Sequence, residues 1–138
     1  MKRINKLALS LFAVSTLAFG HGDVNPQPVE TKGLEKISAD VIVNPFRGNK
    51  DAIEIGKSAY NTNCARCHGL GAVSGGVAPD LRALDALDDD SDEYFISKVQ
   101  GGVVRNGNVY MPPFKDVLSP EAMWTIRAWL ETLPTDDL

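Results

Sequence analysis

The stretch Cys64-Ala65-Arg66-Cys67-His68 decides how the rest of this sequence is interpreted. Its Cys-x-x-Cys-His spacing is typical of covalent haem attachment, because cysteines three apart lie on one helical turn and can each add to a vinyl group of the same porphyrin edge. His68 follows at once and is placed to bind the haem iron as the proximal ligand. Since the chain has only these two cysteines, we expect one covalent haem c, with its iron, held by Cys64, Cys67 and His68.

Two other uses of the cysteine pair fit the sequence less well. A disulfide would suit an oxidising compartment, but the adjacent histidine and the tight spacing favour haem. A thioredoxin-like redox pair is expected within a βαβ pattern, and the surrounding sequence shows no such pattern.

A haem that only transfers electrons needs a second axial ligand, for which the sequence offers three candidates. Met123 lies on the apolar stripe of the last expected helix, where packing accounts for it. His21 lies near an expected cleavage site, and ordering it there would cost entropy. Met111 lies in a non-helical segment stiffened by two prolines, far enough from His68 for the chain to pass round the haem. We therefore expect Met111 to be the second ligand, the alternative being that it only fills the core.

A histidine that binds a metal usually donates its other ring N–H to an acceptor. The backbone carbonyl of Pro79 is a candidate acceptor for His68, although Pro79 could equally be a turn residue. When imidazole and thioether occupy both axial positions of the iron, oxygen and peroxide cannot bind to it. The neutral sulfur ligand also favours the ferrous state. We therefore expect an electron-transfer protein and not an enzyme. The alternatives are a haem peroxidase-like enzyme, a haem sensor, and a fixed cytochrome subunit of another oxidoreductase complex.

The first 20 residues have the composition of a secretory signal. Three basic residues precede an apolar stretch, residues 7–19, which is too short to span a bilayer. We expect cleavage after Gly20, export to the periplasm and no stable membrane insertion; an uncleaved anchor is the alternative. Residues 21–138 would then have 11 basic and 18 acidic side chains, a net charge of about −7. That charge argues against nucleic acid as a partner, and it suits either a neutral or basic docking face or simple solubility.

The rest of the chain divides into an arm and a helical domain. Residues 21–48 contain three prolines and little periodicity, so we expect an extended N-terminal arm that is mobile up to about Thr31. Residues 49–138 are expected to form an all-α domain of three main helices packed around the haem. The first helix would begin at Asn49 and run into Cys64, with Gly56 on its buried face permitting a close helix crossing.

Two further helices are indicated by their end signals. The acidic run at residues 88–93 begins one of them, with Asp90 and Glu93 as a capping box, and Gly101-Gly102 ends it. Calcium binding by this run is the less favoured interpretation. The last helix has Ser119 as N-cap and Pro120 at its first position. Its apolar stripe comprises Met123, Ile126, Trp129, Leu130 and Leu133, and Trp124 lies off the stripe, where it would cover the haem edge or the arm.

Together these features resemble class I cytochrome c over about residues 49–133. The resemblance includes the helix with Gly56 and Tyr60, the attachment motif with Gly69, the turn Ala78-Pro79-Asp80-Leu81, the segment Met111-Pro112-Pro113-Phe114, and the terminal Ala128-Trp129-Leu130-Glu131-Thr132-Leu133. It implies the class I cytochrome c fold, with the first and last helices crossing where Gly56 and Tyr60 meet Trp129. It also implies His68 and Met111 as axial ligands and the Pro79 carbonyl as the partner of His68.

Within that family, the sequence is similar to the cytochromes c550 of quinoprotein ethanol dehydrogenase systems. The approach Asn44-Pro45-Phe46-Arg47-Gly48-Asn49, the glycine-rich loop after the motif and the Asp-rich stretch account for this resemblance. It implies that a periplasmic alcohol dehydrogenase using pyrroloquinoline quinone (PQQ) donates electrons during alcohol oxidation. A terminal oxidase or another cytochrome would accept them. We expect the carrier to be a monomer.

Overall fold

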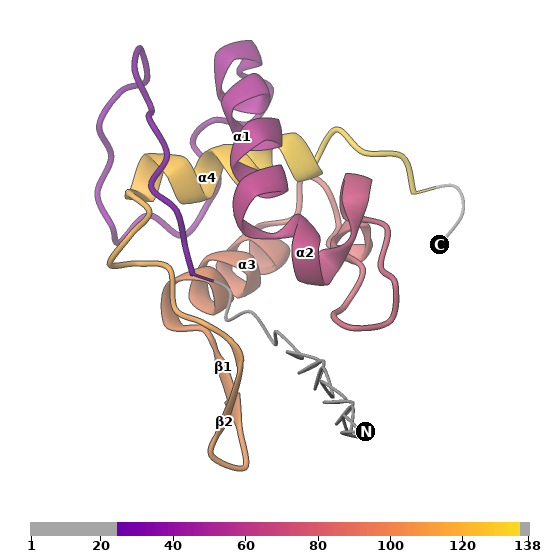
Figure 1. Ribbon diagram of the computed structural model, residues 1–138. Helices are drawn as coiled ribbons and strands as arrows, with labels where there is room; N and C mark the ends of the chain where they lie inside the picture. Colours follow the sequence, from indigo (N-terminus) through magenta and orange to yellow (C-terminus); the bar gives the residue numbers. More distant parts are fainter. Residues whose placement is uncertain (1–24, 136–138) are drawn as a thin grey trace, which may run out of the picture.

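A computed structural model describes residues 25–135, so the expected signal segment, residues 1–20, and His21 lie outside the described residues (Figure 1). The elements within this range are α1 (Lys50–Asn63), α2 (Ala65–His68), the 3₁₀ turns η1 (Leu70–Ala72) and η2 (Leu81–Ala83), α3 (Asp89–Gly101), the strands β1 (Val103–Arg105) and β2 (Asn108–Met111), and α4 (Pro120–Leu130). Among these described helices, each is too short or too polar to cross a membrane.

Helices α1 and α4 cross at the centre of the domain (Figure 1). As expected, α1 begins after Asn49, whose side-chain oxygen accepts a hydrogen bond from the Ala52 N–H at 3.0 Å. At the crossing, a Cβ atom added to Gly56 would lie 1.8 Å from the backbone oxygen of Thr125. Only a residue without a side chain allows the two backbones to approach this closely.

One turn further along α1, two aromatic rings extend the crossing. The ring centroids of Tyr60 and Trp129 are 4.7 Å apart and their planes are tilted by 45°. Such aromatic pairs contribute about 0.5–1.5 kcal/mol beyond the area they bury. The contact implied by the family resemblance is therefore shared between two positions of α4: Tyr60 meets Trp129, and Gly56 meets the backbone of Thr125.

Helix α4 is buried on every side and not only along its apolar stripe. Its N-cap is Ser119, as expected, with the side-chain oxygen accepting from the Ala122 N–H at 3.2 Å. All residues from Glu121 to Leu130 are buried, and the helix ends at Leu130, before the expected Leu133. Trp124 lies in the core, its ring centroid 6.2 Å from that of Phe95 on α3. The second face is buried because α3 and the arm cover it.

Helix α3 has its N-cap two residues earlier than the sequence pattern predicted. The side chain of Asp88 accepts a hydrogen bond from the Ser91 N–H at 2.8 Å, so Asp88 is the N-cap and the expected capping box of Asp90 and Glu93 is wrong. The helix ends at Gly101 as expected, and Gly102 follows with φ 70°. The acidic run therefore begins a helix.

The all-α expectation needs one correction, because β1 and β2 form a small antiparallel hairpin that projects from the helical body (Figure 1). Its turn residues, Asn106 and Gly107, have φ values of 49° and 79°. A two-residue type I′ turn requires positive φ at both positions and favours Asn-Gly for that reason. The signal for this hairpin was thus present in the sequence, between two short apolar runs.

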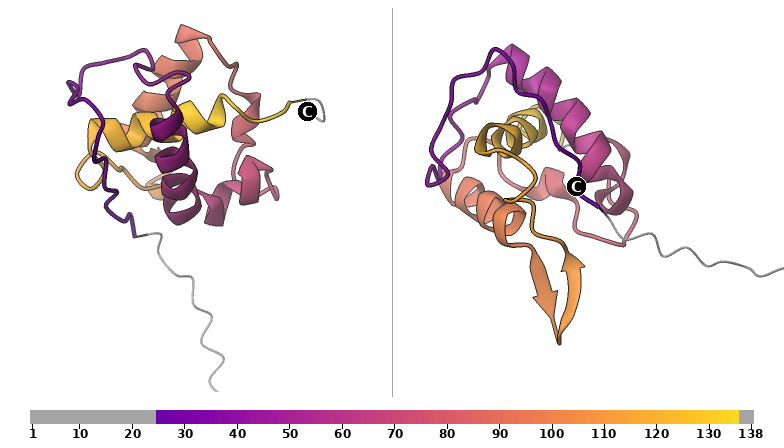
Figure 2. Two further views of the ribbon diagram at one scale, coloured as in Figure 1. Left: turned by 90° about the horizontal axis from the view of Figure 1, so that it is seen from above. Right: turned by 60° about the vertical axis from the view of Figure 1, so that its left-hand side comes forward.

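The N-terminal arm, residues 25–48, wraps around α1 and α4 (Figure 2). The Gln27 N–H donates to the side chain of Asn63 at 2.7 Å, and the Ile37 N–H donates to that of Glu121 at 2.9 Å. The half-buried apolar side chains of the arm that pack on the core are Val29, Leu34, Ile37 and Val41. Residues 25–31, which the sequence predicted to be mobile, thus contact α1 and the core through Gln27 and Val29.

A buried charge network joins the arm to α3 and α4. The carboxylate of Asp92 accepts from Arg127 Nε at 2.7 Å, from Arg47 Nη2 at 2.7 Å and from the Asn44 N–H at 2.8 Å. The side chains of Asp92 and Arg127 are both 0% exposed. The buried carboxylate of Glu131 lies 3.6 Å from the same Arg127 Nε, so Arg127 has two acidic partners. Breaking a buried ion pair costs about 3–5 kcal/mol where the remaining charge has no other partner, and Glu131 places the cost here at the lower end.

Candidate haem site

The attachment motif lies at the junction of α1 and α2. The N–H groups of Cys67 and His68 both donate to the Cys64 carbonyl, at 3.1 and 3.0 Å, which closes the motif into a single helical turn. The Tyr60 hydroxyl donates to the carbonyl of Gly69 at 2.8 Å and ties the end of this turn back to α1. The helix crossing therefore also positions the motif, because Tyr60 takes part in both.

Both cysteines of the motif are half-buried. Burial, together with the neighbouring Cys67, raises the pKa of the Cys64 thiol to about 12. Burial, with smaller effects of Cys64 and Asp80, also raises the pKa of Tyr60 above its usual value. Both groups are consequently uncharged at neutral pH, so Tyr60 acts as a hydrogen-bond donor here.

The imidazole of His68 is oriented by the backbone of a separate loop. Its Nδ1 atom lies 2.8 Å from the carbonyl oxygen of Pro79, so that a protonated Nδ1 donates to this acceptor. The other ring nitrogen, Nε2, is then the one with a lone pair available for a metal. The structure brings together the two residues that the sequence predicted as partners.

Met111 is the last residue of β2, and it is half-buried against the core. Its backbone is held by close contact with the end of α3: a Cβ atom added to Gly102 would lie 2.5 Å from the Met111 carbonyl oxygen. Three residues later, the Phe114 N–H donates to the Val99 carbonyl at 2.9 Å. Sequence reasoning had treated Gly102 only as a helix stop, and it missed this supporting role.

The other ligand candidates are placed differently. Met123 is 2% exposed within the core of α4, as packing predicted. His21 lies outside the described residues. Across residues 25–135 no group of three or more His, Cys, Asp or Glu side chains is arranged to hold a metal ion.

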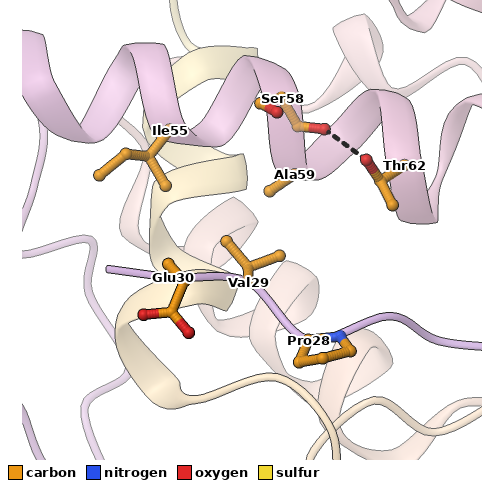
Figure 3. Close-up of a pocket in the computed structure, with 7 residues that line it drawn as sticks. All are labelled: Pro28, Val29, Glu30, Ile55, Ser58, Ala59 and Thr62. Atoms are coloured by element: carbon orange, nitrogen blue, oxygen red, sulfur yellow. Dashed lines mark hydrogen bonds between the residues drawn. The ribbon is translucent and has the colours of Figure 1, made fainter. Parts of the chain in front are cut away.

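A groove of about 280 Å³ lies between α1 and the N-terminal arm (Figure 3). It is lined by Pro28, Val29, Glu30, Ile55, Ser58, Ala59 and Thr62. Figure 3 shows the arm forming one wall and α1 the other, with the hydroxyl of Thr62 donating to the Ser58 carbonyl. The motif cysteines, His68 and Met111 all lie outside its lining, so this groove is separate from the candidate haem site.

The residues of the candidate site have the chemistry that a covalent haem needs. Two thiols stand one helical turn apart, an imidazole has one nitrogen engaged by a carbonyl, and a thioether is half-buried. Half-buried apolar side chains also lie at the edge of the core, and these are Cys64, Ala65, Leu81, Leu84 and Met111. Their partial exposure leaves apolar surface that a haem could cover.

Comparison with known proteins identifies the class. A family model described as cytochrome c oxidase, cbb3-type, subunit III, matches residues 51–130. The chain belongs to this family of c-type cytochrome domains, which implies covalently bound haem c with its iron.

Two individual relatives indicate the role of the chain more specifically than the family does. Cytochrome c550 of Pseudomonas aeruginosa is 50% identical over 136 residues, covering 95% of this chain and 93% of the relative. This similarity indicates an electron-transfer protein and not an enzyme. Quinohemoprotein alcohol dehydrogenase ADH-IIG of Pseudomonas putida is 40% identical over 79 residues, covering 57% of this chain and only 10% of that longer protein.

Solved structures agree with the class. The structure of quinohemoprotein alcohol dehydrogenase ADHIIG from Pseudomonas putida has a TM-score of 0.50 at 36% identity, covering 70% of this chain and 14% of the other. Cytochrome cL of Methylophaga aminisulfidivorans has a TM-score of 0.52 at 24% identity, covering 72% of this chain and 68% of the other, and shares its fold. The expected cytochrome c fold is thereby confirmed, with the small hairpin as an addition.

Proposed function

We propose that the chain is a periplasmic one-electron carrier with a single haem. In this proposal the porphyrin is attached through Cys64 and Cys67, and its iron is ligated by His68 and Met111. The three main helices would pack around it. The observation that favours this most is the contact of 2.8 Å between His68 Nδ1 and the Pro79 carbonyl, since it leaves Nε2 available to a metal.

Haem iron with two protein ligands supplies reversible one-electron transfer between its ferric and ferrous states. The chain's own residues set the conditions for that transfer. His68 is kept in one tautomer by Pro79, and Met111 is kept in place by the backbone contact with Gly102. Filling both axial positions keeps oxygen and peroxide away, which agrees with a carrier and disfavours the peroxidase-like alternative.

Replacing Met111 tests the ligand assignment. The ferric protein should show the weak sulfur-to-iron charge-transfer band, and Met111→Ala should abolish it. Met123→Leu is the matched control, because it removes the other described thioether while conserving core volume, at a cost below about 1.5 kcal/mol. Loss of the band in Met123→Leu, or a wild-type protein without the band that binds carbon monoxide rapidly, would contradict the assignment.

The proposed electron donor is a PQQ-dependent alcohol dehydrogenase, and the proposed acceptor is a terminal oxidase or another cytochrome. The support is that a protein named quinohemoprotein alcohol dehydrogenase contains a segment 40% identical to 79 residues of this chain. A carrier of this kind works in the periplasm, where the expected export signal would deliver it. We also propose that it acts as a monomer without membrane insertion.

A reduction assay separates this partner from others. Purified quinoprotein alcohol dehydrogenase, supplied with alcohol, should reduce the haem-loaded protein rapidly. The rate should respond to ionic strength, because the chain without residues 1–20 has a net charge of about −7. Rapid reduction by an unrelated dehydrogenase, with no response to the alcohol dehydrogenase, would refute this donor and leave the carrier function intact.

A second candidate function is that of a fixed cytochrome subunit in an oxidoreductase complex. The family description, subunit III of a cbb3-type oxidase, favours it. Tight copurification of the native protein with an oxidase or a dehydrogenase would support this candidate. Elution as a free monomer on size exclusion would support the mobile carrier.

A further inference from the structure

The hydrogen bond that orients His68 depends on an exposed loop that has little support from the core. Pro79 itself is exposed, and it has no N–H with which to fix its own position. Its carbonyl direction is set by the torsion between Pro79 and Asp80, which the pyrrolidine ring does not restrict. Something else must hold this peptide if its carbonyl is to remain 2.8 Å from the imidazole.

Ser74 holds the chain on the N-terminal side of Pro79. Its hydroxyl donates to the carbonyl of Ala78, and its oxygen accepts from the Gly76 N–H at 3.0 Å. Gly76 has φ 90°, a conformation that closes this tight loop and suits glycine. The residue just before Pro79 is therefore anchored to a side chain within the same loop.

Asp80 holds the chain on the C-terminal side of Pro79. One carboxylate oxygen accepts from the Ser74 N–H at 3.1 Å and from Arg82 Nη2 at 2.8 Å. The other accepts from the backbone N–H and from Nε of Arg82, both at 3.0 Å. Because the side chain of Arg82 is only 6% exposed, this anchor is itself held firmly.

We propose that Ser74 and Asp80 are positioning residues, which fix the Pro79 carbonyl on His68 and so tune the iron's preference between its two oxidation states. This inference rests on the proposed function, in which His68 is an axial ligand. A firm bond from Nδ1–H makes the imidazole more basic and a better donor to the metal, which favours the ferric state. Loosening the loop should weaken that bond and raise the reduction potential.

Ser74→Ala is the decisive variant, because it removes both hydroxyl contacts without changing any charge. In the haem-loaded protein we expect the His68 Nδ1–H to exchange faster with solvent by NMR. We also expect a rise in midpoint potential equivalent to about a two- to tenfold change in the ferric–ferrous equilibrium, with tenfold equal to about 59 mV for one electron. Ser97→Ala is the matched control, since it removes an exposed hydroxyl that donates to the Tyr94 carbonyl at 2.9 Å on α3.

Asp80→Asn provides a second, independent measurement, and it decides the question if Ser74→Ala does not load haem. An amide can replace only part of the carboxylate's contacts, so the potential should rise and Nδ1–H exchange should again accelerate. The rise should persist at high ionic strength, whereas the effect of removing an exposed charge would be screened.

The two hypotheses fail in different ways. Unchanged potential and unchanged exchange in both variants, with the charge-transfer band intact, would refute the positioning role and leave the carrier function standing. A wild-type protein in which His68 does not bind the iron would refute the proposed function itself.

Discussion

Replacing Gly56 with alanine perturbs the crossing of α1 and α4, which also positions the haem motif through Tyr60. The new Cβ atom would lie 1.8 Å from the Thr125 oxygen and 2.4 Å from its carbonyl carbon. Since ordinary contacts begin at about 3.4 Å, the helices would have to separate by more than 1 Å. The obstructing atoms are backbone and cannot rotate away, so the overpacking cost should reach the upper end of its usual range, about 3 kcal/mol.

Two further contributions bear on the total. Separation of the helices weakens the ring pair of Tyr60 and Trp129, which costs about 1 kcal/mol. Alanine gains about 1 kcal/mol over glycine in helix propensity, which offsets that loss. The expected net destabilisation is therefore about 3 kcal/mol, equivalent to a fall in Tm of about 9–15 °C for a domain of this size.

Thermal and urea unfolding of the haem-loaded variant, followed by circular dichroism, measures this loss. Gly101→Ala is the matched control, because it makes the same change in a helix where nothing lies within 4 Å of the new Cβ atom. It should leave stability unchanged or raise it by up to about 1 kcal/mol. An unaltered unfolding midpoint for Gly56→Ala, or equal losses in both variants, would refute the reasoning.

Three further outcomes are expected. Asp92→Asn should lose about 3 kcal/mol in urea unfolding, the lower end for a broken buried ion pair, because the buried Arg127 keeps only the Glu131 carboxylate at 3.6 Å. Asp89→Asn, at a side chain 68% exposed, should change stability by less than about 0.5 kcal/mol. Glu121→Ala should release the arm, since it removes the oxygen that accepts from the Ile37 N–H, and limited trypsin digestion at Lys36 should accelerate relative to wild type. The hydrogen bonds from Arg82 lower the pKa of Asp80 from 3.8 to about 2, so its contribution is present above pH 3.8 and is lost as pH falls toward 2. The stability difference between wild type and Asp80→Asn should therefore shrink over that window in urea unfolding.

Local signals in the sequence account for the features that were predicted well. The haem motif occupies five consecutive residues, and the caps at Asn49 and Ser119 act within a single turn of helix. The close helix crossing at Gly56 was predicted because glycine destabilises a helix, so a glycine on a buried helix face indicates a close packing contact. Pro79 lies only 11 residues from His68, so its partnership could be proposed from chemistry and then found in the structure. Except for Gly56, whose close contact is with Thr125 on α4, these predictions depended on interactions between residues close in the chain.

The missed features depend on contacts between distant segments. Asp92 was interpreted only as one member of an acidic run that begins a helix, but its partners, Arg127 and Asn44, are 35 and 48 residues away. Nothing in the neighbourhood of Asp92 distinguishes it from the exposed carboxylates beside it. The first part of the arm, up to about Thr31, was expected to be mobile for the same reason, because its anchor Asn63 on α1 belongs to a later part of the chain.

The hairpin is a local signal that the sequence analysis did not use. Asn106-Gly107 between short apolar runs is a strong hairpin pattern, but the Met111 segment was described only as non-helical and the domain was expected to be all-α. This turn matters for the site, because the hairpin that it closes ends at Met111. Gly102 lies against the Met111 backbone at this end of the hairpin, which is the end away from the turn. The proposed second ligand is therefore held by a strand pairing and a close backbone contact. The position of Met111 therefore depends on two glycines, Gly102 and Gly107, whose positive φ values no other residue would adopt as readily.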